Sequence, residues 1–479
     1  MTQSYINLIK IQFKDISDIV YKSFHIYNHS CVIAYIPSIV DNDVLRDYIT
    51  RNLVNEKTSN WSNFVISLNK GEAFNIPYEQ VKSANEAASL ITCGNVILIF
   101  DDHPTMYAFN IVRYSTRTVT ESQNEMVIIG PQEAFIEDIQ INLSLLRHRI
   151  KHTDLKVKEY QVGKYTKSKI YIIFVEGLYK PEVLEDIEQR IKHIKIDGIF
   201  GVTYLVEFLN TKNFPFPILQ YTEKPDILAA SLLEGRIGIM MDGSPTSIIT
   251  PVTLISLLQS AEDYYQNYFT ASWIRIIRFL FSILSIFLPA IYVALTTFHP
   301  QVIPSDLLVT ITAARENIPF TSLTEAFIME ITFEALREAG MRIPKPIGQT
   351  VSIIGGIVIG QAAVQAGIVS APMVIVVSVT GVASYIIPHL ELNLIFRLLR
   401  FPLLLLGGIM GLIGVYIGGF LLFAYMVSLK SFGTPYLQPI APLVLADWKD
   451  GLFRFPHRSS KRKTDAFARK RSLWKEKDK

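Results

Sequence analysis

The sequence predicts a multi-domain protein in which a duplicated α+β cytosolic domain is followed by an α-helical polytopic membrane domain. Three observations lead to this prediction. No apolar run of spanning length occurs before Phe279, two motifs recur in order in the first half of the chain, and residues 347–390 are 44 residues without Asp, Glu, Lys or Arg. A membrane helix needs about 20 apolar residues, so the uncharged stretch is long enough for two crossings.

The predicted boundaries divide the 479 residues into four parts, because a chain of this length is too long for one compact core. In order, the parts are a soluble α+β subdomain (1–127), a joint helix with a second α+β subdomain (128–252), a membrane domain (253–446) and a basic cytoplasmic tail (447–479).

The charge pattern at the two ends predicts that both termini are cytoplasmic. The tail carries 12 Lys or Arg against 5 Asp or Glu, and a basic segment directly after a span favours the inner side of a membrane. Membrane lipids with anionic headgroups are its expected partner, rather than nucleic acid. The N-terminus lacks a basic segment followed by an apolar one, so no secretory signal is expected.

The first half of the chain contains two pairs of similar segments at offsets of about 140 residues. CVIAYIPSIVDNDVLRDYI from Cys31 resembles IYIIFVEGLYKPEVLEDIE from Ile170, each an apolar strand followed by a helix. AASLITCGNVILIFDDHPT from Ala87 resembles AASLLEGRIGIMMDGSPT from Ala229, each a short helix, a strand and a turn. The sequence therefore predicts two related subdomains joined by a helix.

No constellation of residues points to catalysis, a cofactor or a metal. Asp242-Gly243-Ser244-Pro245 could be taken for a nucleophile loop, but its counterpart at Asp101 lacks both the Gly and the Ser, so a turn is favoured. Cys31 and Cys93 are the only cysteines and are expected to be free thiols. There is no Walker A sequence and no GxGxxG after a strand, so the protein is not expected to be an enzyme.

Four membrane spans are predicted, near residues 276–298, 347–367, 372–390 and 401–429. Pro289 lies inside the first span, where a neighbour must satisfy the carbonyl group that the proline leaves free. Arg275 and Arg278 mark the cytoplasmic end of that span. Four spans would place Arg397 and Arg400 on the outer side of the membrane, although basic residues favour the cytoplasmic side. The number of spans therefore stays open between four and six.

The last span is rich in glycine. Gly408, Gly411, Gly414 and Gly418 recur every three or four residues, which predicts a seam of close packing. The segment is long enough to span with a tilt or with a bend at Gly407-Gly408.

An acidic helix is predicted over 321–341, between the first and second spans. Glu330, Glu334 and Glu338 follow one another at intervals of four residues and therefore share a face. One interpretation is an amphipathic helix at the membrane interface with a solvated acidic face. The other is a ring of carboxylates that lines a water-filled vestibule and attracts cations.

The second span is built of small residues and two glutamines, which allows two uses of its surface. Small residues four apart let helices pack closely or form an oligomer interface, whereas amides in hydrocarbon need a partner or a pore. The predicted packing residues are Ser352, Gly356, Gly360 and Ala363, and the predicted pore-lining residues are Gln361, Val364 and Gln365.

At these residues the chain resembles the A subunit of the Ger-type nutrient germinant receptors of endospore-forming bacteria, the GerA family. The resemblance covers almost the whole chain and is carried by residues 214–236, 259–265, 315–320, 325–371 and 431–436. Two positions depart from the family pattern. Ile129 stands where an arginine is usual, which removes a positive charge from the subdomain joint, and Lys224 also replaces an arginine.

The resemblance implies a protein of the inner spore membrane that acts in a complex. Its partners would be a permease-like B subunit that binds the nutrient and a lipoprotein C subunit. The A subunit would be a homo-oligomeric, ion-conducting element that opens when the nutrient binds. The sequence thus predicts a ligand-gated cation channel subunit. The alternatives are a non-conducting scaffold that transmits a signal and, ranked third, a transporter component, because no inverted repeat is evident.

Overall fold

The computed structural model describes residues 3–468 except 27–28, 56–60, 102, 104, 114–124, 126–128, 211–214, 343–357, 446 and 457–465. The chain divides into two compact units. We call residues 1–213, 219–251 and 461–479 the sheet unit, and residues 214–218 and 252–460 the helical unit.

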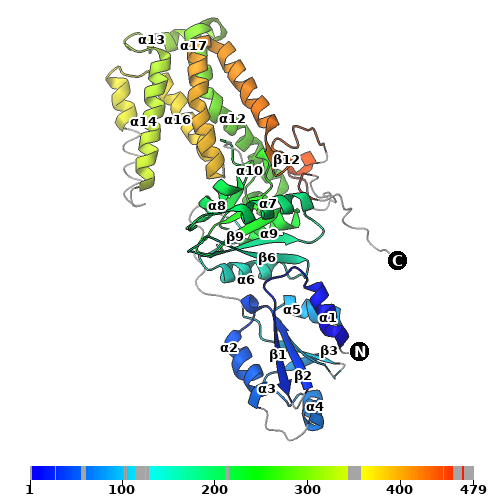
Figure 1. Ribbon diagram of the computed structural model, residues 1–479. Helices are drawn as coiled ribbons and strands as arrows, with labels where there is room; N and C mark the ends of the chain where they lie inside the picture. The colour runs from blue at the N-terminus through cyan, green and yellow to red at the C-terminus, as the bar shows by residue number, and fades with distance from the viewer. Residues whose placement is uncertain are drawn as a thin grey trace. The chain divides into compact units, whose positions relative to one another are not determined.

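The sheet unit contains two antiparallel five-stranded sheets (Figure 1). The first has the strand order β1-β2-β4-β5-β3 and the second the order β6-β7-β9-β10-β8. Each strand of the first sheet therefore has a counterpart at the same position in the second, as the predicted duplication requires. The strands are β1 (Val20–Ile26), β2 (His29–Tyr35), β3 (Tyr78–Val81), β4 (Asn95–Phe100), β5 (Met106–Asn110), β6 (Leu155–Val162), β7 (Ser168–Val175), β8 (Gln220–Thr222), β9 (Ile237–Met241) and β10 (Ser247–Thr250).

Helices cover both faces of the first sheet. Its central strand β4 is buried at every position, as expected for a strand packed on two sides. One face packs on α1 (Gln3–Gln12) and α5 (Ala84–Thr92), and the other on the helical stretch 42–55 and on α4 (Trp61–Lys70). Figure 1 shows these helices around β1 and β2 in blue.

In the second sheet, α9 (Pro225–Leu233) takes the position that α5 has in the first, since each helix directly precedes the central strand of its sheet. α9 packs with α6 (Ile139–Arg149) on one face, through a core that includes Leu143, Leu228 and Met240. α6 is the predicted joint helix, and the carboxylate of Asp138 caps it by accepting hydrogen bonds from two backbone N–H groups. α7 (Pro181–His193) and α8 (Val202–Leu209) lie between β7 and β8 in the chain.

A buried ion pair joins the two subdomains. Arg147 of α6 makes two hydrogen bonds of 3.0 and 2.9 Å to the carboxylate of Asp18, and both side chains are excluded from solvent. Beside the pair, the ammonium group of Lys156 donates to the backbone carbonyls of Gln12 and Lys14. The segment before β1 is thus fastened to the second sheet.

The helical unit is built from α-helices and a small β-hairpin. Its elements are α10 (Leu254–Leu258), α11 (Glu262–Tyr265), α12 (Tyr268–Phe298), α13 (Ser305–Ala313), α14 (Ser322–Arg342), a helix over 358–365, α16 (Ala371–Tyr385), α17 (Leu390–Ser428), β11 (Lys430–Ser431) and β12 (Thr434–Pro435). Among the described residues, α12 and α17 are long and apolar enough to cross a membrane, and α16 is a shorter apolar helix.

α17 folds back on itself at Gly411, whose φ of 61° and ψ of −146° are not helical. A Cβ on Gly414 would touch the carbonyl of Leu406, and one on Gly418 would touch Leu403. In a straight helix residues 403 and 418 are about 22 Å apart, so the two arms are antiparallel, as the gold and orange ribbon in Figure 1 shows. The region predicted as one span over 401–429 therefore holds parts of two helical arms.

Candidate functional site: ion-paired helices of the helical unit

Arg400 links three helices at a point buried within the helical unit. Its side chain is 1% exposed and forms an ion pair with Glu330 of α14, which is 0% exposed. Its Nε donates a 2.9 Å hydrogen bond to the backbone carbonyl of Ser285 in α12. In a regular helix that carbonyl accepts from residue 289, but Pro289 has no N–H. Arg400 is therefore the neighbour that satisfies the carbonyl left free by the proline.

A second ion pair lies one turn along the same two helices. Arg397 Nε donates a 2.8 Å hydrogen bond to Glu334 Oε1, and both side chains are partly buried. Since 330 pairs with 400 and 334 with 397, α14 and the first arm of α17 run antiparallel. The two arginines that conflicted with the predicted topology are thus neutralised inside the helical unit.

Glu325, near the start of α14, joins this helix to two further segments. Its carboxylate is 0% exposed and lies 3.2 Å from Nε of Arg315, in the segment after α13. The other oxygen accepts a 2.9 Å hydrogen bond from the backbone N–H of Ser370, directly before α16. One carboxylate thus holds the entry of α16 and the segment after α13 against α14.

α14 also packs closely on α16. The guanidinium of Arg337 lies 4.1 Å from the ring centre of Tyr385, and its Nη2 is 3.3 Å from the hydroxyl of Ser384. Gly381 leaves room for Phe333, because a Cβ there would come within 2.3 Å of the ring. The charged face of α14 is therefore occupied largely by contacts within the subunit.

The predicted acidic face divides accordingly. Glu330 and Glu334 point to Arg400 and Arg397, whereas Glu338 is exposed. The vestibule hypothesis now depends on Glu338 and on the orientation of these pairs in an assembly, and it stays a prediction.

The predicted pore residues divide between two sides of the helix over 358–365, because Val364 lies with the predicted packing residues and the two glutamines do not. Gly360 faces Val374 of α16, and Ala363 and Val364 are half-buried against the cluster that contains Met373 and Val377. Gln361 and Gln365 are exposed. Ser352 and Gly356 lie outside the described residues. The two amides therefore face away from the core of the helical unit, and their assignment to a pore stays a prediction.

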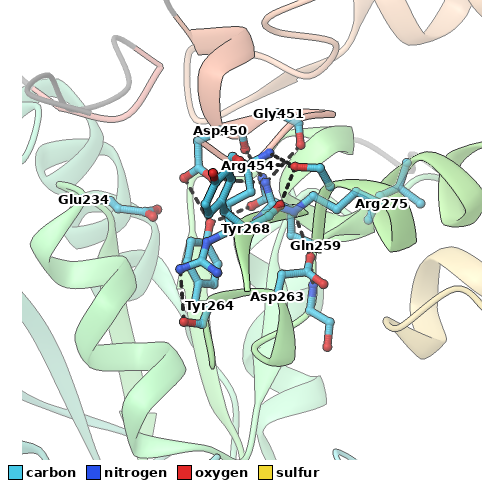
Figure 2. A network of polar contacts seen from close by, with 12 residues as sticks. Glu234, Gln259, Asp263, Tyr264, Tyr268, Arg275, Asp450, Gly451 and Arg454 are labelled. Atoms are coloured by element: carbon cyan, nitrogen blue, oxygen red, sulfur yellow. Dashed lines mark hydrogen bonds and ion pairs between the residues drawn. The ribbon is translucent and has the colours of Figure 1, made fainter. Parts of the chain in front are cut away.

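A polar network closes the start of α12 (Figure 2). The carboxylate of Asp263 accepts hydrogen bonds of 2.9 Å from Arg275 and of 2.9 and 3.1 Å from Arg278. Burial alone would raise the pKa of this carboxyl, but the hydrogen bonds and charge of Arg278, with the charge of Arg275, hold the pKa below its usual value. The arginines that mark the end of the span are thus paired rather than free.

The same network reaches the segment that follows the last span. Arg275 Nη1 donates to the backbone carbonyl and to the carboxylate of Asp450, at 3.0 Å each. The Tyr264 hydroxyl lies 3.1 Å from the same carboxylate, and Gln259 donates to the Asp450 carbonyl. The 259–265 motif therefore has a structural role, since it joins α12 to the chain after α17.

Ser431 links two segments of the helical unit that are far apart in the sequence. One ends at Ile218, shortly before β8, and the other begins at Val252, shortly after β10. The Ser431 hydroxyl, in β11, donates a 2.7 Å hydrogen bond to the carbonyl of Ile218 and accepts one of 3.0 Å from the N–H of Val252. The residue is 0% exposed. One hydroxyl group thus connects both segments to the β11–β12 hairpin, which directly follows α17.

These ion pairs were not predicted from the sequence, in which Glu330, Glu334 and Glu338 form one acidic stripe and Arg397 and Arg400 conflict with the predicted topology. The signal that could have joined them was spacing, because two acids four residues apart and two arginines three residues apart can pair on antiparallel helices.

Comparison with known proteins identifies the class. The chain matches the model of the Bacillus/Clostridium GerA spore germination protein family over residues 7–466. It is 41% identical over 455 residues to uncharacterized membrane protein YfkQ of Bacillus subtilis (strain 168), covering 95% of this chain and 88% of that protein. The chain therefore belongs to the GerA spore germination protein family, as its resemblance implied.

Further relatives have names that refer to spore germination. The chain is 36% identical to spore germination protein KA of Bacillus subtilis (strain 168), over 94% of this chain and 83% of that protein. It is 38% identical to spore germination protein A1 of the same organism, over 78% of each. A solved structure, the N-terminal domain of the A subunit of the Bacillus megaterium spore germinant receptor GerK3, is 30% identical, with a TM-score of 0.38, over 51% of this chain and 92% of that one.

Proposed function

We propose that this chain is a subunit of a nutrient germinant receptor in the inner spore membrane, and that it provides the path through which cations leave when the receptor is activated. Its family and the names of its relatives support the germination role. α12 and α17, which are long and apolar enough to span, support a membrane location. We further propose that copies of this chain assemble with one another and with permease-like and lipoprotein subunits.

The observation that carries the conducting role is the exposure of Gln361 and Gln365. They lie one helical turn apart, on a helix whose opposite side packs on α16. An amide exposed to hydrocarbon costs a few kcal/mol unless it finds a polar partner. Water in a pore, or the same amides in neighbouring copies, would provide that partner.

Thiol labelling in spores tests this role. Cys31 and Cys93 are replaced by serine or alanine, and single cysteines are placed at Gln361 and Gln365. The matched control is a cysteine at Ile375, which is 63% exposed on the apolar α16 and should face lipid. We expect a membrane-impermeant, positively charged thiol reagent to react at 361 and 365 when nutrient is present, and to slow cation release, while position 375 stays unlabelled.

Two outcomes would reject the pore role. One is a lack of labelling at 361 and 365 with and without nutrient, in variants that still germinate. The other is equal labelling at 375, which would mean that the reagent reports general accessibility.

The second candidate is a subunit that transmits the signal without conducting. It is favoured by the pairing of Glu330 and Glu334 with arginines of the same subunit, which leaves their carboxylates neutralised rather than available to passing cations. Purified full-length chain in planar bilayers separates the two candidates. Conductance that changes with a glutamine-to-lysine substitution at 361 supports the pore, and nutrient-dependent germination without any conductance supports the transmitter.

A further inference from the structure

Three residues of the basic tail are packed onto the sheet unit. Ala466 and Phe467 are 5% and 4% exposed, although the sequence around them is dominated by Lys and Arg. Phe467 is the apolar centre of an Ala-Phe-Ala triplet between two basic clusters. Burial of an aromatic ring in such a tail indicates a receiving site on the surface beneath it.

The receiving site begins at the turn between α9 and β9. Gly235 has a φ of +92°, a conformation that favours glycine. A Cβ at this position would come within 2.6 Å of the carbonyl of Leu178 and within 2.9 Å of Cα of Ala468. Because residue 235 is a glycine, the backbone of the tail at Ala468 can pack directly against the turn; any side chain at 235 would occupy this space.

Arg236 forms the floor of the site. Its guanidinium lies 3.9 Å from the centre of the Phe467 ring. The same group is fixed by the carboxylate of Glu234 at 3.1 Å and by the side-chain oxygen of Gln220 at 3.3 Å. A guanidinium held flat by two other partners offers an aromatic ring a preformed cation–π surface, so little order has to be created when the ring docks.

Lys180 completes the site by recognising the tail backbone. Its ammonium group donates a hydrogen bond to the carbonyl of Ala466. Both cations of the site thus bind uncharged groups of the tail, a carbonyl oxygen and a ring face. This chemistry selects an aromatic residue with small neighbours, and it gives no advantage to the basic residues on either side.

We propose that the sheet unit carries a docking site for the Ala466-Phe467-Ala468 segment of its own chain, and that docking fastens the C-terminal tail to the second α+β subdomain. This proposal is independent of whether the chain conducts ions.

Competition with a labelled peptide tests the proposal on the full-length chain in detergent. The probe is fluorescein-labelled KRKTDAFARKRSL, residues 461–473, at physiological salt. Protein carrying Phe467→Ala has a vacant site and should bind this probe. Unaltered protein, whose own tail fills the site, should bind it at least about tenfold more weakly, because burial of a phenylalanine ring changes a binding constant by at least that factor.

Two controls make the result specific. A probe in which Phe467 is alanine keeps every charge and should lose binding, and Arg236→Gln in the Phe467→Ala protein should also abolish it. The proposal is overturned if both probes bind equally, which would indicate charge alone, or if neither binds the vacant protein. Equal binding to vacant and unaltered protein would show that the tail does not dock in its own chain. An unchanged melting temperature verifies that each variant is folded.

Discussion

Replacement of Arg400 by methionine should destabilise the helical unit more than any other single change among its ion pairs. Arg400 neutralises Glu330 and satisfies the carbonyl of Ser285, and its side chain is 1% exposed. Loss of one partner of a buried ion pair costs about 3–5 kcal/mol because the other charge stays buried. The carbonyl of Ser285, which Pro289 also leaves unpaired, adds about 1–3 kcal/mol.

The two contributions can be separated with further variants. Glu330→Met together with Arg400→Met removes both charges, so the ion-pair cost should largely disappear and only the carbonyl term of about 1–3 kcal/mol should remain. Adding Pro289→Ala restores an N–H that can bond to Ser285, and should recover most of that remainder. The double-mutant cycle between 330 and 400 should give a coupling energy of at least about 3 kcal/mol, because each single change leaves one charge buried and the double change leaves none.

Unfolding of the full-length chain in detergent, followed by intrinsic fluorescence against increasing denaturing detergent, provides these free energies. Arg397→Met is the matched control, since its ion pair with Glu334 is partly exposed and should cost only about 1 kcal/mol. The reasoning is refuted if the changes at 330 and 400 add within about 0.5 kcal/mol, or if Pro289→Ala has no effect in the charge-free double variant.

Three more results are expected from the same measurement of unfolding. Ser431→Ala should cost about 1–3 kcal/mol because it leaves two buried backbone groups unpaired, whereas Ser428→Ala, whose exposed hydroxyl bonds only to its own helix, should cost less than about 0.5 kcal/mol; equal costs would contradict this. Burial raises the pKa of Glu125 from 4.5 to about 7, so the folded state keeps a proton that the unfolded chain loses. Stability should therefore fall as pH rises from about 4.5 through about 7, and Glu125→Gln should remove that dependence; a parallel pH profile for the variant would refute it. Gly407→Ala should destabilise by about 1–3 kcal/mol, since its Cβ would lie 2.8 Å from a backbone carbonyl of α12, while Gly360→Ala, with its nearest neighbour at 3.6 Å, should be neutral; the reverse order would rule out close packing as the cause.

The duplicated sheets were predictable because their signals are local. β2 and β7 are apolar runs with a helix start behind them, and β4 and β9 follow short helices with a glycine between, so the repeat is visible in the sequence. β3 and β8 were not predicted. They are only four and three residues long, too short for a periodic pattern, and they form because a neighbouring strand supplies their hydrogen bonds.

The reversal in α17 could not be placed from sequence. Glycines at 407, 408, 411, 414 and 418 all permit a break, and the sequence predicted either a tilted span or a bend at the first two. Gly411 takes the positive φ, while Gly407 and Gly408 let α12 and α14 approach closely. Which glycine bends and which one packs depends on contacts with segments far away in the chain, such as His299 beside Gly411.

The distribution of polar groups in the helical unit fits the proposed assembly of this chain with other subunits. The buried carboxylates of α14, Glu325 and Glu330, are each neutralised by an arginine of the same subunit. The amides of Gln361 and Gln365 instead lie on the surface of the next helix. In the proposed membrane location, hydrocarbon would offer these amides no hydrogen bonds, and water or another subunit would be the expected partner. The backbone N–H of Ser370, which follows that helix in the chain, donates a hydrogen bond to Glu325 of α14. Movement of the helix would therefore be transmitted to α14 through this carboxylate. A contact of Gln361 or Gln365 with another subunit would act on the ion pairs of α14 by the same route.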